Sequence, residues 1–350
     1  MSINAGNAVI AKARALYGKR ITLEQYQDMI NCRTVNEVAS YLKNSTNYQT
    51  ALSNISETNI HRGQLETIIR REAFNVYTKM YHYLNTIEEN LFHYITMEFE
   101  MQEILRMVLL LKAGNPENFI IGLPGYLIEK ARIDLVALAE VRSFDELIRV
   151  LGDTHYAEIL KRLKPTPENP KIDYIKCEHA LYTYYFGRLF QMINKNARGT
   201  ERLELRRLMG MRLDQLNTRI IVRSKVHFNG QPKNIAQRIF PFHRKLTPEK
   251  IEEWLHAPNT EQLIKLVKES ASEIGLDKKL TGNENDFIES YTERLQYQAC
   301  ANYLHLSTNV SVVFYSYFIL SQIEVKNIIN IIEGIRYQIP KEEIQKLLVL

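Results

Sequence analysis

The stretch FYSYFILSQIEVKNIINIIEGIRYQ, residues Phe314–Gln338, decides how this chain folds. Four isoleucines follow one another at intervals of three and four residues: Ile328, Ile331, Ile332 and Ile335. That spacing places a continuous apolar stripe on one face of a helix. Glu324 and Asn327 stand three residues apart one turn earlier, so they share a helical face. The stretch therefore predicts one long helix that carries a polar pair ahead of its buried stripe.

The same polar pair recurs twice earlier in the chain. Asp214 and Asn217 lie in a similar helical pattern. Glu100 and Glu103 precede an apolar stripe as well, although Glu103 stands where the other two copies have an amide. Three copies of one pair leading into one stripe predict a chain built from three similar units.

Three helix starts support this repeat. Thr34, Ser143 and Asn259 are each followed three residues later by Glu or Gln and then by apolar residues at helical spacing. A side-chain oxygen at such a position accepts from a backbone N–H of the first helical turn. With loops rich in Gly and Pro between the units, the pattern predicts three helical domains, over residues 1–116, 117–232 and 233–350.

Composition favours an all-α protein. Gly (14) and Pro (10) are scarce in 350 residues, and no sustained alternation of apolar and polar residues predicts a strand. Three distant cysteines argue against a disulfide framework. The N-terminal stretch lacks the apolar core of a signal peptide, and the run Val310–Ile323 is too short to span a membrane. We expect a soluble protein that is able to lie against a membrane.

Charge is unevenly distributed. The formal net charge is +5, yet residues 195–225 contain nine bases and three acids. One interpretation is a solvated helix face. The other is a contact with an acidic protein or with anionic lipid headgroups, for which the candidates are Arg202, Arg206, Arg207 and Arg212. A nucleic-acid partner is disfavoured, because the rest of the chain offers no matching basic surface.

Motifs for catalysis are absent from the sequence. It contains neither a phosphate-binding glycine loop nor a H-E-x-x-H motif, and Cys177 with His179 forms an isolated pair. The acid and amide pairs could in principle do acid–base work. A structural interpretation is favoured, in which each pair bridges neighbouring helices or satisfies backbone groups at helix ends of its own unit. We therefore expect no catalytic residue, no cofactor, no metal and no small-molecule substrate.

Three segments carry a resemblance to a known family: Asn7–Tyr17, Val35–Lys43 and above all Glu324–Arg336. The chain resembles the C subunit of V-type and A-type ATPases, the counterpart of the d subunit of eukaryotic V-ATPases. The resemblance implies three helical domains around a pseudo-threefold axis, arranged as a funnel. It also implies a non-catalytic adaptor between the central-stalk subunits D and F and the membrane proteolipid rotor ring. Such an adaptor transmits torque coupled to transport of H+ or Na+, and it is peripheral on the cytoplasmic face of the cell membrane.

Two other functions stay open at this point: a free-standing helical-repeat scaffold that binds proteins, and an all-helical enzyme with an unrecognised site. One further hypothesis concerns Ile339–Leu350, which looks like the beginning of a fourth unit. We expect this segment to pack near the first unit.

Overall fold

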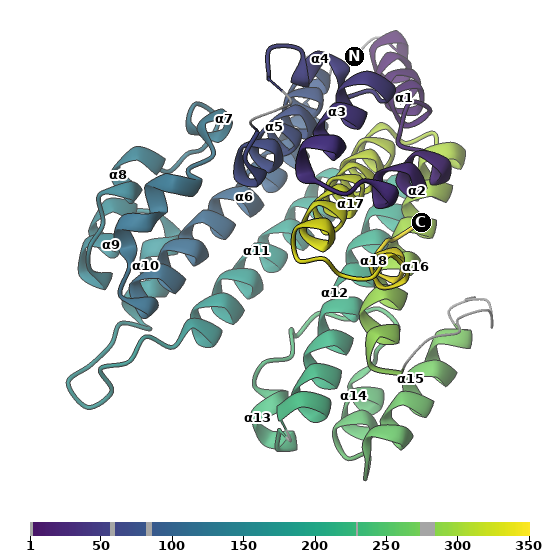
Figure 1. Ribbon diagram of the computed structural model, residues 1–350. Coiled ribbons are helices and arrows are strands. Elements are labelled where there is room, and N and C mark those ends of the chain that lie inside the picture. The colour runs from purple at the N-terminus through teal and green to yellow at the C-terminus, as the bar shows by residue number, and fades with distance from the viewer. Residues whose placement is uncertain (1–2, 57–59, 82–85, 229, 274–283) are drawn as a thin grey trace. The chain divides into compact units, whose positions relative to one another are not determined.

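The computed structural model describes residues 3–56, 60–81, 86–228, 230–273 and 284–350. Within these ranges every regular element is a helix, apart from one isolated bridge between Thr166 and Asn169. The predicted all-α class is confirmed. The chain divides into two compact units (Figure 1). Unit 1 comprises Met1–Asn85, Gly199–Ile239 and His243–Leu350, and unit 2 comprises Thr86–Arg198 and Phe240–Phe242.

Unit 1 draws its helices from both ends of the chain and from its middle. They are α1 (Ile3–Tyr17), α2 (Leu23–Asn31), α3 (Val35–Ser45), α4 (Gln49–Leu52), α5 (Arg62–Tyr81), α12 (Gly199–Phe228), α13 (Pro232–Ala236), α14 (Pro248–Leu255), α15 (Thr260–Glu273), α16 (Glu284–Leu306), α17 (Val310–Arg336) and α18 (Lys341–Lys346).

Unit 2 consists of two long helices with short ones between them. They are α6 (Thr86–Ala113), the 3-10 helix η2 (Pro116–Gly122), α7 (Gly125–Ile128), α8 (Leu135–Ala139), α9 (Phe144–Leu151), α10 (His155–Lys161) and α11 (Tyr174–Asn196). None of the described helices in either unit is both long enough and apolar enough to cross a membrane.

The three expected helix starts are confirmed. Thr34 and Ser143 each accept from the backbone N–H three residues on, at 3.2 Å. Asn259 accepts from Gln262 N–H at 2.8 Å. In the first two copies the carboxylate of Glu37 or Glu146, three residues after the cap, also accepts from the backbone N–H of the residue before the cap, at 2.7 Å. Because each start satisfies its exposed N–H groups locally, three neighbouring residues suffice to define it.

The apolar stripe of α17 lies in the larger core of unit 1. Its four isoleucines are buried against α2, α3, α5 and α18. The C-terminal segment packs there too, since Ile344 and Leu348 belong to the same cluster as Met29 of α2. Lys341 Nζ also donates to Asn31 Oδ1 at 2.9 Å. The hypothesis that this segment packs near the first predicted domain, residues 1–116, is confirmed.

Each long helix with a polar pair packs against short helices that follow it in the chain. The second half of α12 lies against α13 and α15 around Trp254 and Leu263. In unit 2, α6 lies against η2, where Phe119 is fully buried. For α17, the last long helix, the short helices that follow are α18 and then α2 and α3 at the start of the chain. Local packing thus repeats three times, with its last copy joining the two ends of the sequence.

Candidate functional site: three acids that hold the short helices

Glu324 on α17 binds the backbone that leads into α2. Its Oε2 accepts from Ile21 N–H at 2.9 Å, and its Oε1 accepts from Tyr48 O–H at 3.1 Å. Ile21 immediately precedes Thr22, the N-cap of α2. Burial raises the pKa of Glu324, and these hydrogen bonds oppose the rise because they favour the carboxylate. The side chain therefore holds the entry of α2 at a fixed place on α17.

Glu100 on α6 makes the equivalent contact in unit 2. Its Oε1 accepts from Arg132 N–H at 2.5 Å, and its Oε2 accepts from Tyr156 O–H at 3.1 Å. Arg132 lies two residues before Asp134, the N-cap of α8. Burial raises the pKa of Glu100 as well. The two glutamates thus share one geometry: one oxygen on a backbone N–H and the other on a tyrosine.

Asp214 on α12 binds two backbone groups. Its Oδ1 accepts from Arg244 N–H at 2.9 Å, and its Oδ2 accepts from Lys245 N–H at 2.8 Å. These residues lead into α14, whose N-cap is Thr247. In all three copies the partner lies across a predicted domain boundary from the acid. Of the two structural interpretations, these contacts agree with bridging between neighbouring helices rather than with binding inside one predicted domain.

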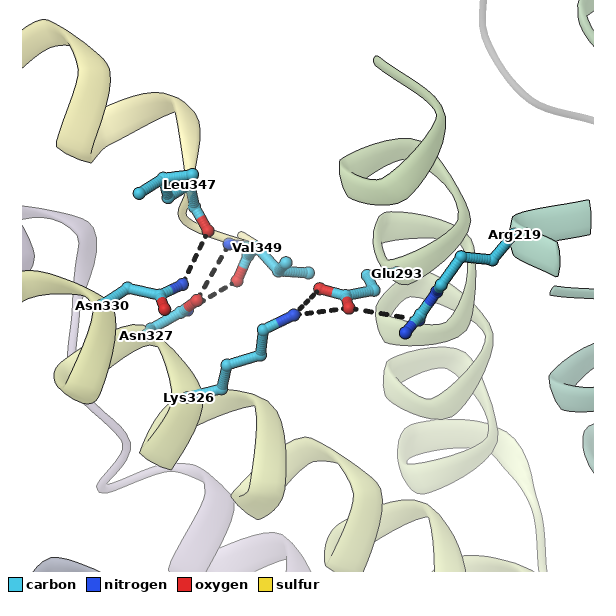
Figure 2. A network of polar contacts seen from close by, with 7 residues as sticks. All are labelled: Arg219, Glu293, Lys326, Asn327, Asn330, Leu347 and Val349. Atoms are coloured by element: carbon cyan, nitrogen blue, oxygen red, sulfur yellow. Dashed lines mark hydrogen bonds and ion pairs between the residues drawn. The ribbon is translucent and has the colours of Figure 1, made fainter. Parts of the chain in front are cut away.

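The amide position of α17 binds a different segment, the C-terminal end of the chain. Asn327 is 1% exposed; its Nδ2 donates to Val349 O at 2.8 Å, and Val349 N–H donates to its Oδ1 at 3.0 Å. Asn330 Nδ2 donates to Leu347 O at 3.2 Å (Figure 2). Asn217, the equivalent on α12, is fully buried.

Glu103 stands where the other two copies have an amide, and it contacts η2 indirectly through Arg106. Glu103 Oε2 accepts from Arg106 at 2.7 and 2.9 Å, and Arg106 Nη1 donates to Phe119 O at 2.9 Å. The guanidinium also lies 3.7 Å from the centre of the Phe119 ring. At this position of the repeat an acid–arginine pair stands in place of the amide, and the arginine contacts Phe119 of η2.

The arrangement around the acids is suited to holding backbone. Burial raises the pKa of Tyr48 and of Tyr317, which keeps both phenols protonated around Glu324.

Cys177 is buried, which raises its thiol pKa to about 11, and the ring of His179 stacks on that of Phe240 with 5.1 Å between the ring centres. In the part of the chain that the structure describes, no three His, Cys, Asp or Glu side chains gather closely enough to hold a metal ion.

The candidate basic residues separate into two groups. Arg202, Arg206 and Arg207 are exposed on the first half of α12. Arg212 is half-buried, and its Nη1 donates to the hydroxyl oxygen of Tyr315 on α17 at 3.1 Å. Arg212 is thus less exposed to solvent than the other three candidates. Sequence reasoning missed Arg244, because its loop position carries no periodic signal.

Comparison with known proteins identifies what the chain is similar to. The family model described as "ATP synthase (C/AC39) subunit" matches residues 9–347. The C subunit of the A-type ATP synthase from Desulfurococcus sp. (strain SY) is 21% identical over 61% of this chain and 56% of its own length. Its namesake from Pyrococcus abyssi is 22% identical over 66% of this chain and 59% of its own length. For Thermococcus gammatolerans the values are 24%, 61% and 55%. The chain thus spans somewhat over half the length of these relatives.

Proposed function

Because the chain belongs to the ATP synthase (C/AC39) subunit family, we propose that it is a non-catalytic central-stalk adaptor of a rotary V/A-type ATPase. In this role it links stalk subunits D and F to the membrane proteolipid rotor ring. It transmits torque coupled to transport of H+ or Na+, and it is peripheral on the cytoplasmic face of the cell membrane. Its predicted organisation is three domains, 1–116, 117–232 and 233–350, arranged as a funnel.

The repeated acid contact is the observation that supports this role most directly. In each copy a carboxylate on a long helix holds the backbone ahead of the short helices. Breaking such a contact leaves N–H groups without partners, so relative movement of the helices is opposed. A part that passes torque onward needs this resistance to shear between its helices.

The long helices supply stiffness along their axes. α6 has 28 residues, α12 has 30 and α17 has 27. At about 1.5 Å per residue, each is roughly 40–45 Å long. The three repeated acids accept from backbone N–H groups, so we propose a mechanical role for these residues and no catalytic one.

The exposed arginines of α12 are the proposed contact for a partner subunit or for anionic lipid headgroups. We expect the purified chain to bind subunits D and F and the detergent-solubilised ring in a pull-down assay. Changing Arg202, Arg206 and Arg207 to Glu should weaken at least one of these complexes and reduce its salt dependence. Lys161, Arg162 and Lys171 are also exposed, and changing them to Glu provides a control with the same change in charge.

Two outcomes would overturn parts of this proposal. Unchanged assembly and unchanged salt dependence in the α12 variant would remove the arginines from the interface. Failure of the wild-type chain to bind either stalk or ring would remove the adaptor function itself and favour the free-standing scaffold.

A further inference from the structure

A groove of about 400 Å³ runs between α12 and α16 in unit 1. One wall carries Arg207 and Met211 of α12, together with Arg244 from the segment between α13 and α14. The facing wall is formed by α16, including Leu295 and Tyr303. The groove therefore combines positive charge on one side with apolar and aromatic surface on the other.

Both the backbone and the side chain of Arg244 make contacts that fix its position in the groove. Its backbone N–H donates to Asp214 at 2.9 Å. Its side chain lies against Gly210, where an added Cβ would stand 2.8 Å from the Arg244 Cβ. Only a residue without a side chain allows this approach, so Gly210 permits the second arginine to reach α12 close to Arg207.

Two acids lie near the two guanidinium groups: Glu204 lines the groove, and the charge of Asp214 favours the charged form of Arg244 and so raises its pKa. Among the described residues neither arginine forms an ion pair, and Arg207 shares a hydrogen bond with Tyr303. The Oε2 of Glu204 already accepts from Ser307 at 2.6 Å and from Asn309 at 2.8 Å. Burial lowers the pKa of Arg244, and the nearby charge of Arg207 lowers it further. An incoming carboxylate would relieve this repulsion.

The opposite rim offers apolar contact and amides. Leu306 at the end of α16 is 79% exposed, which is unusual for a large apolar side chain. Gln298 and Asn302 on α16 also line the groove. Acidic and apolar side chains one helical turn apart on a partner would meet the arginines and Leu306 together.

We propose that this groove binds an acidic amphipathic segment of a partner protein, with its carboxylates on Arg207 and Arg244 and an apolar side chain against Leu306. The inference deepens the proposed function and rests on it only in taking the partner to be another component of the same rotary complex. A protein segment fits better than a membrane surface, because the two arginines line the wall of a recess together with apolar and amide groups.

The test uses the full-length chain and a fluorescein-labelled probe peptide of glutamate, leucine and alanine, about 15 residues long with glutamates four apart. Fluorescence anisotropy measures its affinity for the wild type and for the Arg207→Gln/Arg244→Gln double variant. We expect the double variant to bind at least about tenfold more weakly, since charge-assisted hydrogen bonds to both guanidinium groups are lost. A peptide with glutamine in place of glutamate should show a similar loss on the wild type.

The matched control is Lys161→Gln/Arg162→Gln, which removes the same charge from exposed positions outside the groove. We expect it to change the affinity by less than about threefold, because exposed charges act weakly through solvent. Equal loss in the two double variants would overturn the proposal, as would absence of wild-type binding to the peptide.

Two further experiments test whether the position of Arg244 matters as well as its charge, and whether the groove binds protein rather than lipid. Gly210→Ala keeps every charge but displaces Arg244, so the peptide should bind more weakly although the net charge is unchanged. Circular dichroism checks that each variant is folded. Co-sedimentation with vesicles of anionic phospholipid should not depend on Arg207 and Arg244. Vesicle binding that requires these two residues while peptide binding does not would overturn the assignment. Since no stalk or ring is present, failure here is distinct from failure of the adaptor function.

Discussion

Glu324 on α17 and Asp214 on α12 make the same kind of contact with partners that differ in exposure. Both accept from the backbone that leads into short helices. Both carboxylates are half-buried, but their partners differ. Ile21 and Tyr48, which donate to Glu324, are each 4% exposed, whereas Arg244 and Lys245, which donate to Asp214, are half-buried. The backbone geometry repeats while the dielectric environment does not. A repeated fold can therefore keep one mechanical element and vary the chemistry around it.

The C-terminal segment accounts for much of this difference. Val349 and Leu350 line the cavity beside Glu324, which holds only about 50 Å³, and the hydroxyls of Tyr17 and Tyr297 meet there at 3.0 Å. The groove lined by Arg244, whose backbone N–H binds Asp214, is about 400 Å³. The C-terminal segment thus packs over one copy of the repeat, whereas the groove next to another copy is the partner site proposed above.

The largest expected effect comes from removing Ile339–Leu350, which opens the α17 site. Ile344, Leu348 and Val349 are each 1% exposed. Burying one such side chain contributes roughly 1.5–3 kcal/mol. After the ordering entropy of the segment is regained, we expect the free energy of unfolding to fall by about 4 kcal/mol, measured by urea denaturation. A chain lacking only Leu350, which is 41% exposed, is the control; similar stability of both truncated chains would contradict the interpretation that the segment packs over the α17 site.

The second prediction compares the acids themselves. Glu324→Ala leaves Ile21 N–H and Tyr48 O–H without partners in a buried place, so we expect a loss of about 3 kcal/mol. Asp214→Ala should cost about 1–2 kcal/mol, because water reaches the freed N–H groups of Arg244 and Lys245. Chemical denaturation of both variants measures the difference. Equal losses would mean that burial does not distinguish the two copies.

The third prediction concerns pH. Burial raises the pKa of Glu324 above the ordinary value of about 4.3 for glutamate. Between these two values the folded state binds more protons than the unfolded state, so this residue's contribution to stability falls as pH rises. The slope cannot exceed about 1.4 kcal/mol per pH unit. Wild type should thus lose stability relative to Glu324→Gln as pH rises from about 4; a constant difference up to about pH 8 would refute the assignment.

The smallest effect is expected at Lys326, which neighbours the buried Asn327. Lys326 Nζ lies 2.5 and 2.6 Å from the Glu293 oxygens, and Arg219 lies 3.5 Å from the same carboxylate (Figure 2). The Lys326 side chain is 49% exposed, so Lys326→Ala should cost only about 0.5–1 kcal/mol at low salt. Thermal denaturation should show the cost vanish near 1 M salt, where screening is nearly complete. A cost that persists at high salt would indicate a packing role for the lysine.

Much of the fold was predictable because its signals are local. The isoleucine spacing of α17 predicts a buried stripe, and the four residues are buried. Thr34, Ser143 and Asn259 predict helix starts because each cap depends on a residue three positions away. The polar pairs drew attention to the three acids for the same reason, since they repeat at matching places.

The partners of those acids were not predictable from spacing. Nothing local indicates that Asp214 binds Arg244 and Lys245 or that Arg212 points to Tyr315. Arg244 stands beside Arg207 only because Gly210 leaves room for it. This contact between a loop and a helix depends on how the elements pack. It cannot be predicted from the positions of charged residues along the sequence.

The sequence by itself determined where helices begin, which face of each is apolar, and that one motif occurs three times. Each of these depends on residues within about one or two turns. Tertiary structure alone decided that each long helix with a polar pair receives short helices, and that those received by α17 come from both ends of the chain. Ile21 and Glu324 are 303 residues apart. A contact at that separation is set by the packing of whole helices, because only packing brings such distant residues within reach of a hydrogen bond.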